Sequence, residues 1–156
     1  MGIDSIGHEI YVEATPDIVF DVISRPEYVR EWFAEQVGSD LQPGTDGSFT
    51  FLDHGLGGRT EEVVVVESQR PSTFAYRWTH DPGEQATPAN SLLVTFDLEP
   101  SGTGTLLRLT ETGFRARTPG DPEAEALHRD HVRGWEIFLP RLAPLAERLE
   151  RSGDGR

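Results

Sequence analysis

A stripe of large side chains at helical spacing near the C-terminal end constrains the fold more than any other feature of the sequence. Its members follow one another at steps of three and four residues: His128, His131, Trp135, Phe138, Leu142, Leu145 and Leu149. This spacing predicts a long amphipathic helix whose stripe must be buried against another element. Asp121 and Pro122 favour a helix start there, and Pro140 predicts a kink because proline has no N–H to donate.

The middle of the chain has a period of two residues, which is typical of half-buried strands. After a first strand at Ile6–Glu13, five more are predicted between turns rich in Gly and Pro: Gly47–Asp53, Arg59–Ser68, Thr73–His80, Ser91–Glu99 and Thr105–Thr112. Two short helices are predicted after the first strand, at Pro16–Ser24 and Glu27–Glu35, because Thr15 and Pro16 form a typical helix start.

These elements together predict an α+β fold. Short connections make neighbouring strands antiparallel, so we expect a curved antiparallel sheet of about six strands wrapped around the long C-terminal helix. The length suits one domain over residues 1–151. Residues 152–156 are predicted to be a disordered tail.

Charge and composition narrow the classes of function. Acidic residues outnumber basic ones 27 to 14, giving a net charge of −13, so we expect no nucleic-acid partner. The absence of cysteine excludes thiolate catalysis and cysteine-ligated metals. No apolar stretch reaches the roughly 18–20 residues of a membrane span, and no secretory signal is visible. We therefore expect a cytoplasmic protein.

Several short motifs, in the right order, resemble the SRPBCC (START-like) superfamily and, within it, the homologues of the heat-shock protein 90 ATPase activator. The matching residues are Ala14-Thr15-Pro16, Tyr28, Trp32-Phe33, Pro43-Gly44, Pro71–Trp78, Gly104–Thr110, Gly113-Phe114 and Gly134-Trp135. The resemblance covers about residues 6–150 and implies a helix-grip fold with a deep cavity between sheet and helix. Members of this superfamily differ widely in function, and those related to the chaperone activators often carry His where this chain has Glu111.

The candidate ligand-binding residues are aromatic and polar side chains that the strand and helix phases turn toward this cavity. They are Trp32, Phe51, His54, Glu62, Tyr76, Trp78, Glu111, His131 and Trp135. Trp and Tyr suit a cavity wall because each has an apolar body and a polar tip. We expect Trp135 to anchor both fold and pocket, with Gly134 small enough to let the helix approach the sheet.

Two carboxylates in this set make acid–base chemistry an open alternative. The strand at Arg59–Ser68 is predicted to point Thr60, Glu62, Val64 and Val66 inward, and Glu111 shares the inward phase of its own strand. Desolvation raises the pKa of a carboxyl in an apolar cavity, which suits proton transfer. Arg59, His54 or His80 at the rim would pair with such a carboxyl, and a register slip of one residue would place both carboxylates in solvent.

No metal, cofactor or nucleotide motif is visible in the sequence. His128 and His131 lie three residues apart on the predicted helix, but no third ligand stands at a recognisable spacing. We therefore predict no metal site and no cofactor, and we assign no catalytic residue.

These observations favour the binding of a small hydrophobic or aromatic molecule in an internal cavity. One alternative is an enzyme similar to polyketide aromatases and cyclases, in which Glu62, Glu111 or a His moves protons. Another is a regulator similar to the chaperone-ATPase activators, which acts through its outer surface in the stress response. A chaperone and a second copy of the chain are therefore further candidate partners.

Overall fold

The computed structural model describes residues 4–52 and 58–153. Within these residues, seven strands form one antiparallel sheet in the order β1-β7-β6-β5-β4-β3-β2. The strands are β1 Ser5–Val12, β2 Gln36–Val37, β3 Asp46–Phe51, β4 Arg59–Gln69, β5 Thr73–Trp78, β6 Leu92–Ser101 and β7 Gly104–Thr112. The helices are α1 Pro16–Ser24, α2 Pro26–Trp32, α3 Phe114–Arg117, α4 Asp121–Phe138, the 3-10 turn η2 Leu139–Arg141 and α5 Leu142–Ser152.

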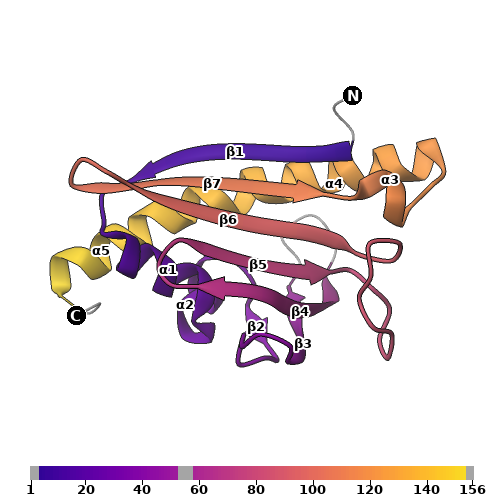
Figure 1. Ribbon diagram of the computed structural model, residues 1–156, viewed down its shortest axis with the longest axis horizontal. Coiled ribbons are helices and arrows are strands. Elements are labelled where there is room, and N and C mark those ends of the chain that lie inside the picture. The colour runs from indigo at the N-terminus through magenta and orange to yellow at the C-terminus, as the bar shows by residue number, and fades with distance from the viewer. Residues whose placement is uncertain (1–3, 53–57, 154–156) are drawn as a thin grey trace.

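The C-terminal helices lie along one face of the sheet, as Figure 1 shows, with α4 behind one end of the strands and α5 behind the other. Of the predicted stripe, His128 is only half-buried, and the other six members are buried: His131, Trp135, Phe138, Leu142, Leu145 and Leu149. Pro140 lies in the 3-10 turn that separates α4 from α5, because its ring and missing N–H interrupt the α-helical bonds. The α+β helix-grip fold predicted from the sequence is confirmed.

Two elements of the structure were not predicted, and the last helix is longer than expected. A two-residue strand, β2, pairs with β3 at the edge of the sheet, so the described part of the chain has seven strands instead of about six. A short helix, α3, occupies part of the predicted loop before α4. Ser152 closes α5, and Gly153 ends the helix with a positive φ of 78°, so the tail predicted from residue 152 onward is helical at its start.

The face of β4 that points toward the C-terminal helices is the opposite of the face predicted from the sequence. Glu61 pairs with Phe49 of β3, whereas Val63 and Val65 pair with Trp78 and Tyr76 of β5. Directly paired residues share a face of an antiparallel sheet, so these odd-numbered residues point toward the helix. The predicted inward set, which included Glu62, is therefore wrong by one residue. Thr60 confirms the correction, because its hydroxyl lies 2.9 Å from that of Thr50 on the exposed side.

Aromatic rings fill most of the space between the sheet and the helix. Phe33, which follows α2, stacks on Trp135 with ring centroids 5.3 Å apart and an interplanar angle of 2°. It also contacts the rings of Trp32, Phe49, Phe51, Trp78 and Phe138. The deep cavity that the resemblance implies is therefore reduced to a smaller pocket at one end of this aromatic core.

No helix within residues 4–52 and 58–153 has both the length and the apolarity needed to cross a membrane.

Candidate functional site

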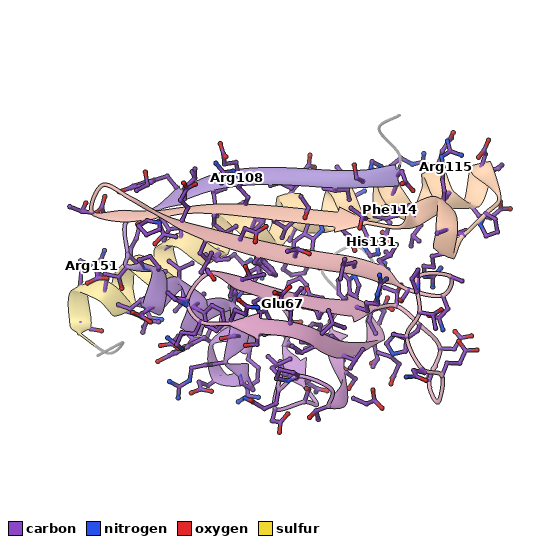
Figure 2. The ribbon with its side chains drawn as sticks, viewed as in Figure 1. Glu67, Arg108, Phe114, Arg115, His131 and Arg151 are labelled. Carbon is purple, nitrogen blue, oxygen red and sulfur yellow. The ribbon has the colours of Figure 1, made fainter. Side chains whose placement is uncertain are left out.

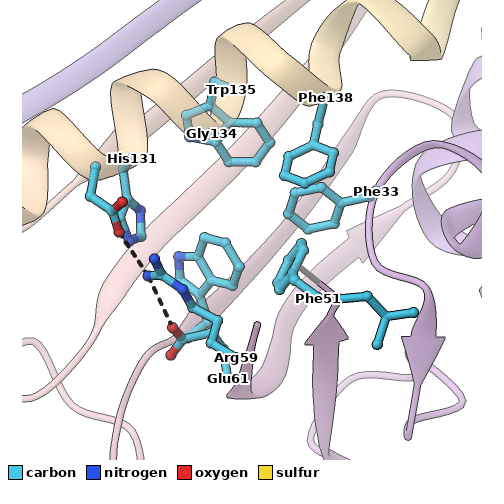
Figure 3. A pocket seen from close by; sticks show the side chains of 11 residues that line it. Phe33, Phe51, Arg59, Glu61, His131, Gly134, Trp135 and Phe138 are labelled. Atoms are coloured by element: carbon cyan, nitrogen blue, oxygen red, sulfur yellow. Dashed lines mark ion pairs between the residues drawn. The ribbon is translucent and has the colours of Figure 1, made fainter. Parts of the chain in front are cut away.

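The candidate site is a pocket between helix α4 and strands β3, β4 and β5 (Figure 3), with a volume of about 60 Å³. Its wall consists of Phe33, Phe51, Leu52, Arg59, Glu61, Trp78, Asp130, His131, Gly134, Trp135 and Phe138. Sites for drug-sized ligands are about 300–1,000 Å³. The pocket therefore encloses only the end of a flat ring, and the rest of a ligand would extend through its mouth.

The inner part of the pocket is aromatic. Phe51 and Phe138 lie 5.5 Å apart between ring centroids, and Trp78 and Trp135 lie 6.2 Å apart. Five aromatic side chains line the pocket, and all five are buried. Such a wall favours flat apolar molecules, which can stack on the rings or contact their edges.

The outer part of the pocket carries charged groups. Arg59 Nη1 lies 2.7 Å from the Asp130 carboxylate and 3.7 Å from that of Glu61, and dashed lines mark these ion pairs in Figure 3. The hydrogen bond with Asp130 raises the pKa of Arg59 despite partial burial. Burial raises the pKa of Glu61 more than the positive charge of Arg59 lowers it. One end of a ligand would thus meet a fixed cation and two carboxyl groups.

A buried carboxylate lies directly behind the pocket wall. Glu111 is fully buried, and it accepts hydrogen bonds from Trp78 Nε1 at 2.7 Å and from Trp135 Nε1 at 2.8 Å. Its Oε2 also lies 2.9 Å from Nδ1 of His131. One acceptor group therefore holds three of the side chains that line the pocket, because Trp78, His131 and Trp135 all belong to its wall.

His131 itself lies at the end of the sheet where α3 packs on α4. Its ring contacts those of Phe114, at 5.7 Å between centroids, and Trp78, at 5.4 Å. Figure 2 places His131 and Phe114 close together, whereas Arg108 lies farther along the strands. Ring contacts on two sides, together with the bond to Glu111, fix the plane of the imidazole.

The structure brings only part of the predicted site set together. Phe51, Trp78, His131 and Trp135 line the pocket. Two others, Trp32 and Tyr76, are buried away from the pocket wall, and Trp32 Nε1 donates to the carbonyl of Val22 at 2.9 Å. Glu111 supports the wall from behind. Glu62 lies in a groove on the other face of β4, beside Asp46 and His80, and His54 falls outside the described residues.

The remaining wall residues were absent from the predicted set. They are Phe33, Leu52, Glu61, Asp130, Gly134 and Phe138, together with Arg59, which was expected only at the rim. Phe33 enters the wall because helix α2 ends at Trp32, three residues before the predicted end, and the next residue turns inward. Glu61 follows from the corrected phase of β4, and Asp130 neighbours His131 on α4.

The raised pKa of Glu61 predicts a pH-dependent contribution to stability. The folded state favours the protonated carboxyl, so the contribution is fully present below the unfolded pKa of about 4.3 and is lost as pH rises through the folded pKa. Glu61→Gln cannot titrate, so we expect it to lose less stability than the parent between about pH 4 and about pH 8. Thermal melts across this range measure the difference. Glu62→Gln is the matched control, and parallel profiles for parent and Glu61→Gln would contradict the assignment.

The hydroxyl of Tyr76 leads to a second prediction. Within the described residues it is buried without a hydrogen-bond partner, and burial, with the charge of Glu111, raises the pKa of Tyr76 well above its ordinary value. Because an unpaired buried hydroxyl costs about 1–3 kcal/mol, we expect Tyr76→Phe to raise the free energy of unfolding by about 1 kcal/mol. Urea unfolding measures this, with Tyr11→Phe as an exposed control. A loss of stability would mean that the hydroxyl has a partner, such as a buried water.

The fold and this pocket define a helix-grip protein of the SRPBCC superfamily. The family model described as "Activator of Hsp90 ATPase homolog 1-like protein" matches residues 13–147, and the chain belongs to that family. No curated protein matches the sequence.

Solved structures similar to this chain share its fold at low sequence identity. Protein NE0264 from Nitrosomonas europaea has a TM-score of 0.73 and 15% identity, covering 95% of this chain and 97% of that one. The Aha1 dimer from Colwellia psychrerythraea has a TM-score of 0.66 and 19% identity, covering 89% and 92%. DynU16, from the dynemicin biosynthetic locus, has a TM-score of 0.67 and 21% identity, covering 92% of this chain and 47% of that one.

Proposed function

We propose that this protein binds a small hydrophobic or aromatic molecule in the pocket between the sheet and helix α4. The observation that carries the proposal is the space at Gly134. This residue lines the pocket, and a Cβ added to it would meet nothing within 4 Å. The packing of the helix on the sheet therefore does not require glycine here, contrary to the sequence-based expectation.

The position of Gly134 on the helix supports this interpretation. It lies three residues after His131 and four before Phe138, so a side chain at this position would share their face. A glycine inside a helix costs about 0.5–1 kcal/mol relative to alanine. The unfilled glycine site in the pocket wall leaves space that a bound molecule can occupy.

The wall indicates the chemistry of the ligand. The aromatic rings suit a single flat ring, of which the volume of about 60 Å³ encloses a part. Arg59, Glu61 and Asp130 at the mouth suit one polar substituent on that ring.

The indole N–H signals of the protein provide a direct test of binding. Trp78 and Trp135 line the pocket, whereas Trp32 lies in the core and serves as an internal control. In ¹H–¹⁵N spectra, phenol and phenylacetone are expected to shift the Trp78 and Trp135 signals in a saturable way and to leave Trp32 in place. Equal small shifts of all three signals, or none, would contradict binding at this site.

Filling the space at Gly134 should abolish binding without unfolding the protein. Gly134→Leu places a side chain in the pocket, so we expect the ligand-induced shifts to disappear. Glu136→Leu, at an exposed position of the same helix, is the matched control and should bind normally. Binding by Gly134→Leu with parent affinity would place the ligand elsewhere.

The smaller change, Gly134→Ala, predicts a gain in stability. Its methyl group meets nothing within 4 Å, so alanine keeps its helical advantage without a clash. We expect the free energy of unfolding to rise by about 0.5–1 kcal/mol, measured by urea denaturation. A loss of stability would show that the helix and sheet are packed more closely at this point.

The family match favours a second candidate function, activation of an Hsp90-type chaperone in the cytoplasm. This activity would use the outer surface, so Gly134→Leu should retain it. The test is the rate of ATP hydrolysis by a purified Hsp90 with and without the protein. The Aha1 neighbour from Colwellia psychrerythraea is described as a dimer, and sedimentation equilibrium would show whether two copies of this chain associate.

A further inference from the structure

One polar pair at the pocket wall has a geometry that ligand binding alone does not require. His131 is buried, lines the pocket and places Nδ1 2.9 Å from the Glu111 carboxylate. Glu111 Oε2 also accepts the indole N–H of Trp78, and Oε1 accepts that of Trp135. Donation to this carboxylate places a proton on Nδ1 of His131, so the neutral imidazole carries its lone pair on Nε2.

The second nitrogen of His131 is available to a bound molecule. No hydrogen-bond partner for Nε2 occurs among residues 4–52 and 58–153, and this atom is not one of the buried unpaired atoms in that part of the chain. The same pocket contains Arg59, whose guanidinium is held by Asp130 at 2.7 Å and by Glu61 at 3.7 Å. A positioned base and a fixed cation thus share one small apolar pocket.

We propose that His131 acts as a general base on a small aromatic ketone or aldehyde bound in this pocket, with Glu111 as its positioning residue and Arg59 as the cation that stabilises the oxyanion. The proposal rests on the proposed ligand-binding function and names its substrate class, an enolisable carbonyl compound. The aromatic walls hold the ring, and the carbonyl oxygen faces Arg59.

The step is a proton transfer that needs no other reactant. Nε2 of His131 takes a proton from the carbon next to the carbonyl group. The electron pair of the broken C–H bond forms the C=C bond of an enolate, while the C=O π pair moves onto oxygen beside Arg59. Return of a proton from the imidazolium to carbon regenerates the ketone. In D₂O the imidazolium exchanges its proton with solvent, so the substrate gains deuterium at that carbon.

Deuterium exchange of phenylacetone measures this step directly. ¹H NMR follows the loss of the benzylic protons in D₂O, in buffer and with the folded full-length chain. We expect the protein to accelerate exchange about 100-fold or more over buffer. His131→Phe should return the rate to that of buffer. Arg59→Met should lower it about 100-fold, and Arg133→Met, at an exposed position of α4, should leave it unchanged.

The experiment distinguishes this proposal from the ligand-binding function on which it rests. Shifts of the Trp78 and Trp135 signals without accelerated exchange in the parent would overturn the proposal and leave ligand binding standing. If the parent shows neither the signal shifts nor accelerated exchange, both proposals are overturned. Because His131→Phe removes a buried hydrogen bond, Arg59→Met at the pocket mouth is the second variant. Parent-like exchange in both variants would also overturn the proposal.

The role of Glu111 has its own spectroscopic readout. The ¹⁵N signals of neutral His131 should show the proton on Nδ1 and the lone pair on Nε2. A proton on Nε2 would overturn the assignment of His131 as the base. Glu111→Gln keeps the side-chain shape but offers one N–H₂ group in place of an acceptor, so we expect mixed tautomers and slower exchange. An unchanged tautomer and rate in Glu111→Gln would show that Glu111 does not position His131.

Discussion

Replacing Glu111 with leucine is expected to lower the free energy of unfolding by about 3–5 kcal/mol. The carboxylate is fully buried, and its removal leaves the indole N–H groups of Trp78 and Trp135 and the imidazole of His131 without their acceptor. Each unpaired buried donor costs about 1–3 kcal/mol. Domains of this kind are stable by about 5–15 kcal/mol, so Glu111→Leu approaches the limit of folding.

Urea unfolding of the parent, Glu111→Leu and Glu62→Leu measures this effect with a matched control. Glu62 lies on the opposite face of the sheet from the aromatic core, so Glu62→Leu should change stability by less than about 1 kcal/mol. A loss in Glu111→Leu as small as that of the control would mean that the three donors find other partners. A large loss in Glu62→Leu would instead contradict the pairing register of β4.

Much of the fold was predictable because its signals are local and repeated. In β5, the side chains of Phe74, Tyr76 and Trp78 alternate with polar or small ones, and all three are buried. In the C-terminal helix, the stripe repeats over several turns, so one ambiguous residue does not change which helix face is predicted to be buried. Pro140 marks the break between α4 and α5 because its effect on a helix is local: it has no N–H to donate, and its ring clashes with the carbonyl four residues earlier.

The face of β4 was not predictable from β4 itself. Val63, Val64, Val65 and Val66 are apolar in both strand phases, so their pattern has no preferred side. The direction comes from β3 and β5, where Phe49 and Trp78 pair with Glu61 and Val63. Pairing register is a long-range property, and an error of one residue exchanges the two faces. This error put Glu62 in the candidate site in place of Glu61.

The sequence pattern predicted which aromatic residues point inward, but not which of them border the pocket. Trp32 and Tyr76 are inward and buried, yet they lie away from the pocket wall. The boundary depends on where helix α4 crosses the sheet and on the insertion of Phe33 between them, and neither follows from a period of two or 3.6 residues. Glu111 shows the same limit. The sequence pattern correctly predicted that its side chain points inward, but it did not predict that the carboxylate lies behind the pocket wall.

Replacing Trp135 with alanine is expected to lower the free energy of unfolding by about 3–5 kcal/mol. Trp135 is buried, stacks on Phe33 and donates its indole N–H to Glu111 at 2.8 Å. Alanine therefore removes a large apolar surface, leaves a cavity beside Phe33 and takes one donor from the buried carboxylate. Thermal and urea unfolding measure the loss, and ligand-induced shifts of the Trp78 signal report on the pocket.

Trp135→Phe divides this loss into its two parts. Phenylalanine keeps a ring that can stack on Phe33 but has no N–H for Glu111, so we expect it to cost about 1–3 kcal/mol, less than alanine. Combining Trp135→Phe with Glu111→Leu gives a double-mutant cycle, in which the two residues should be coupled by about 0.5–3 kcal/mol because they contact each other directly. Additive losses would show that the N–H of Trp135 contributes nothing through Glu111. Equal losses for Trp135→Ala and Trp135→Phe would show that this hydrogen bond, and not the stacked ring, holds helix α4 on the sheet.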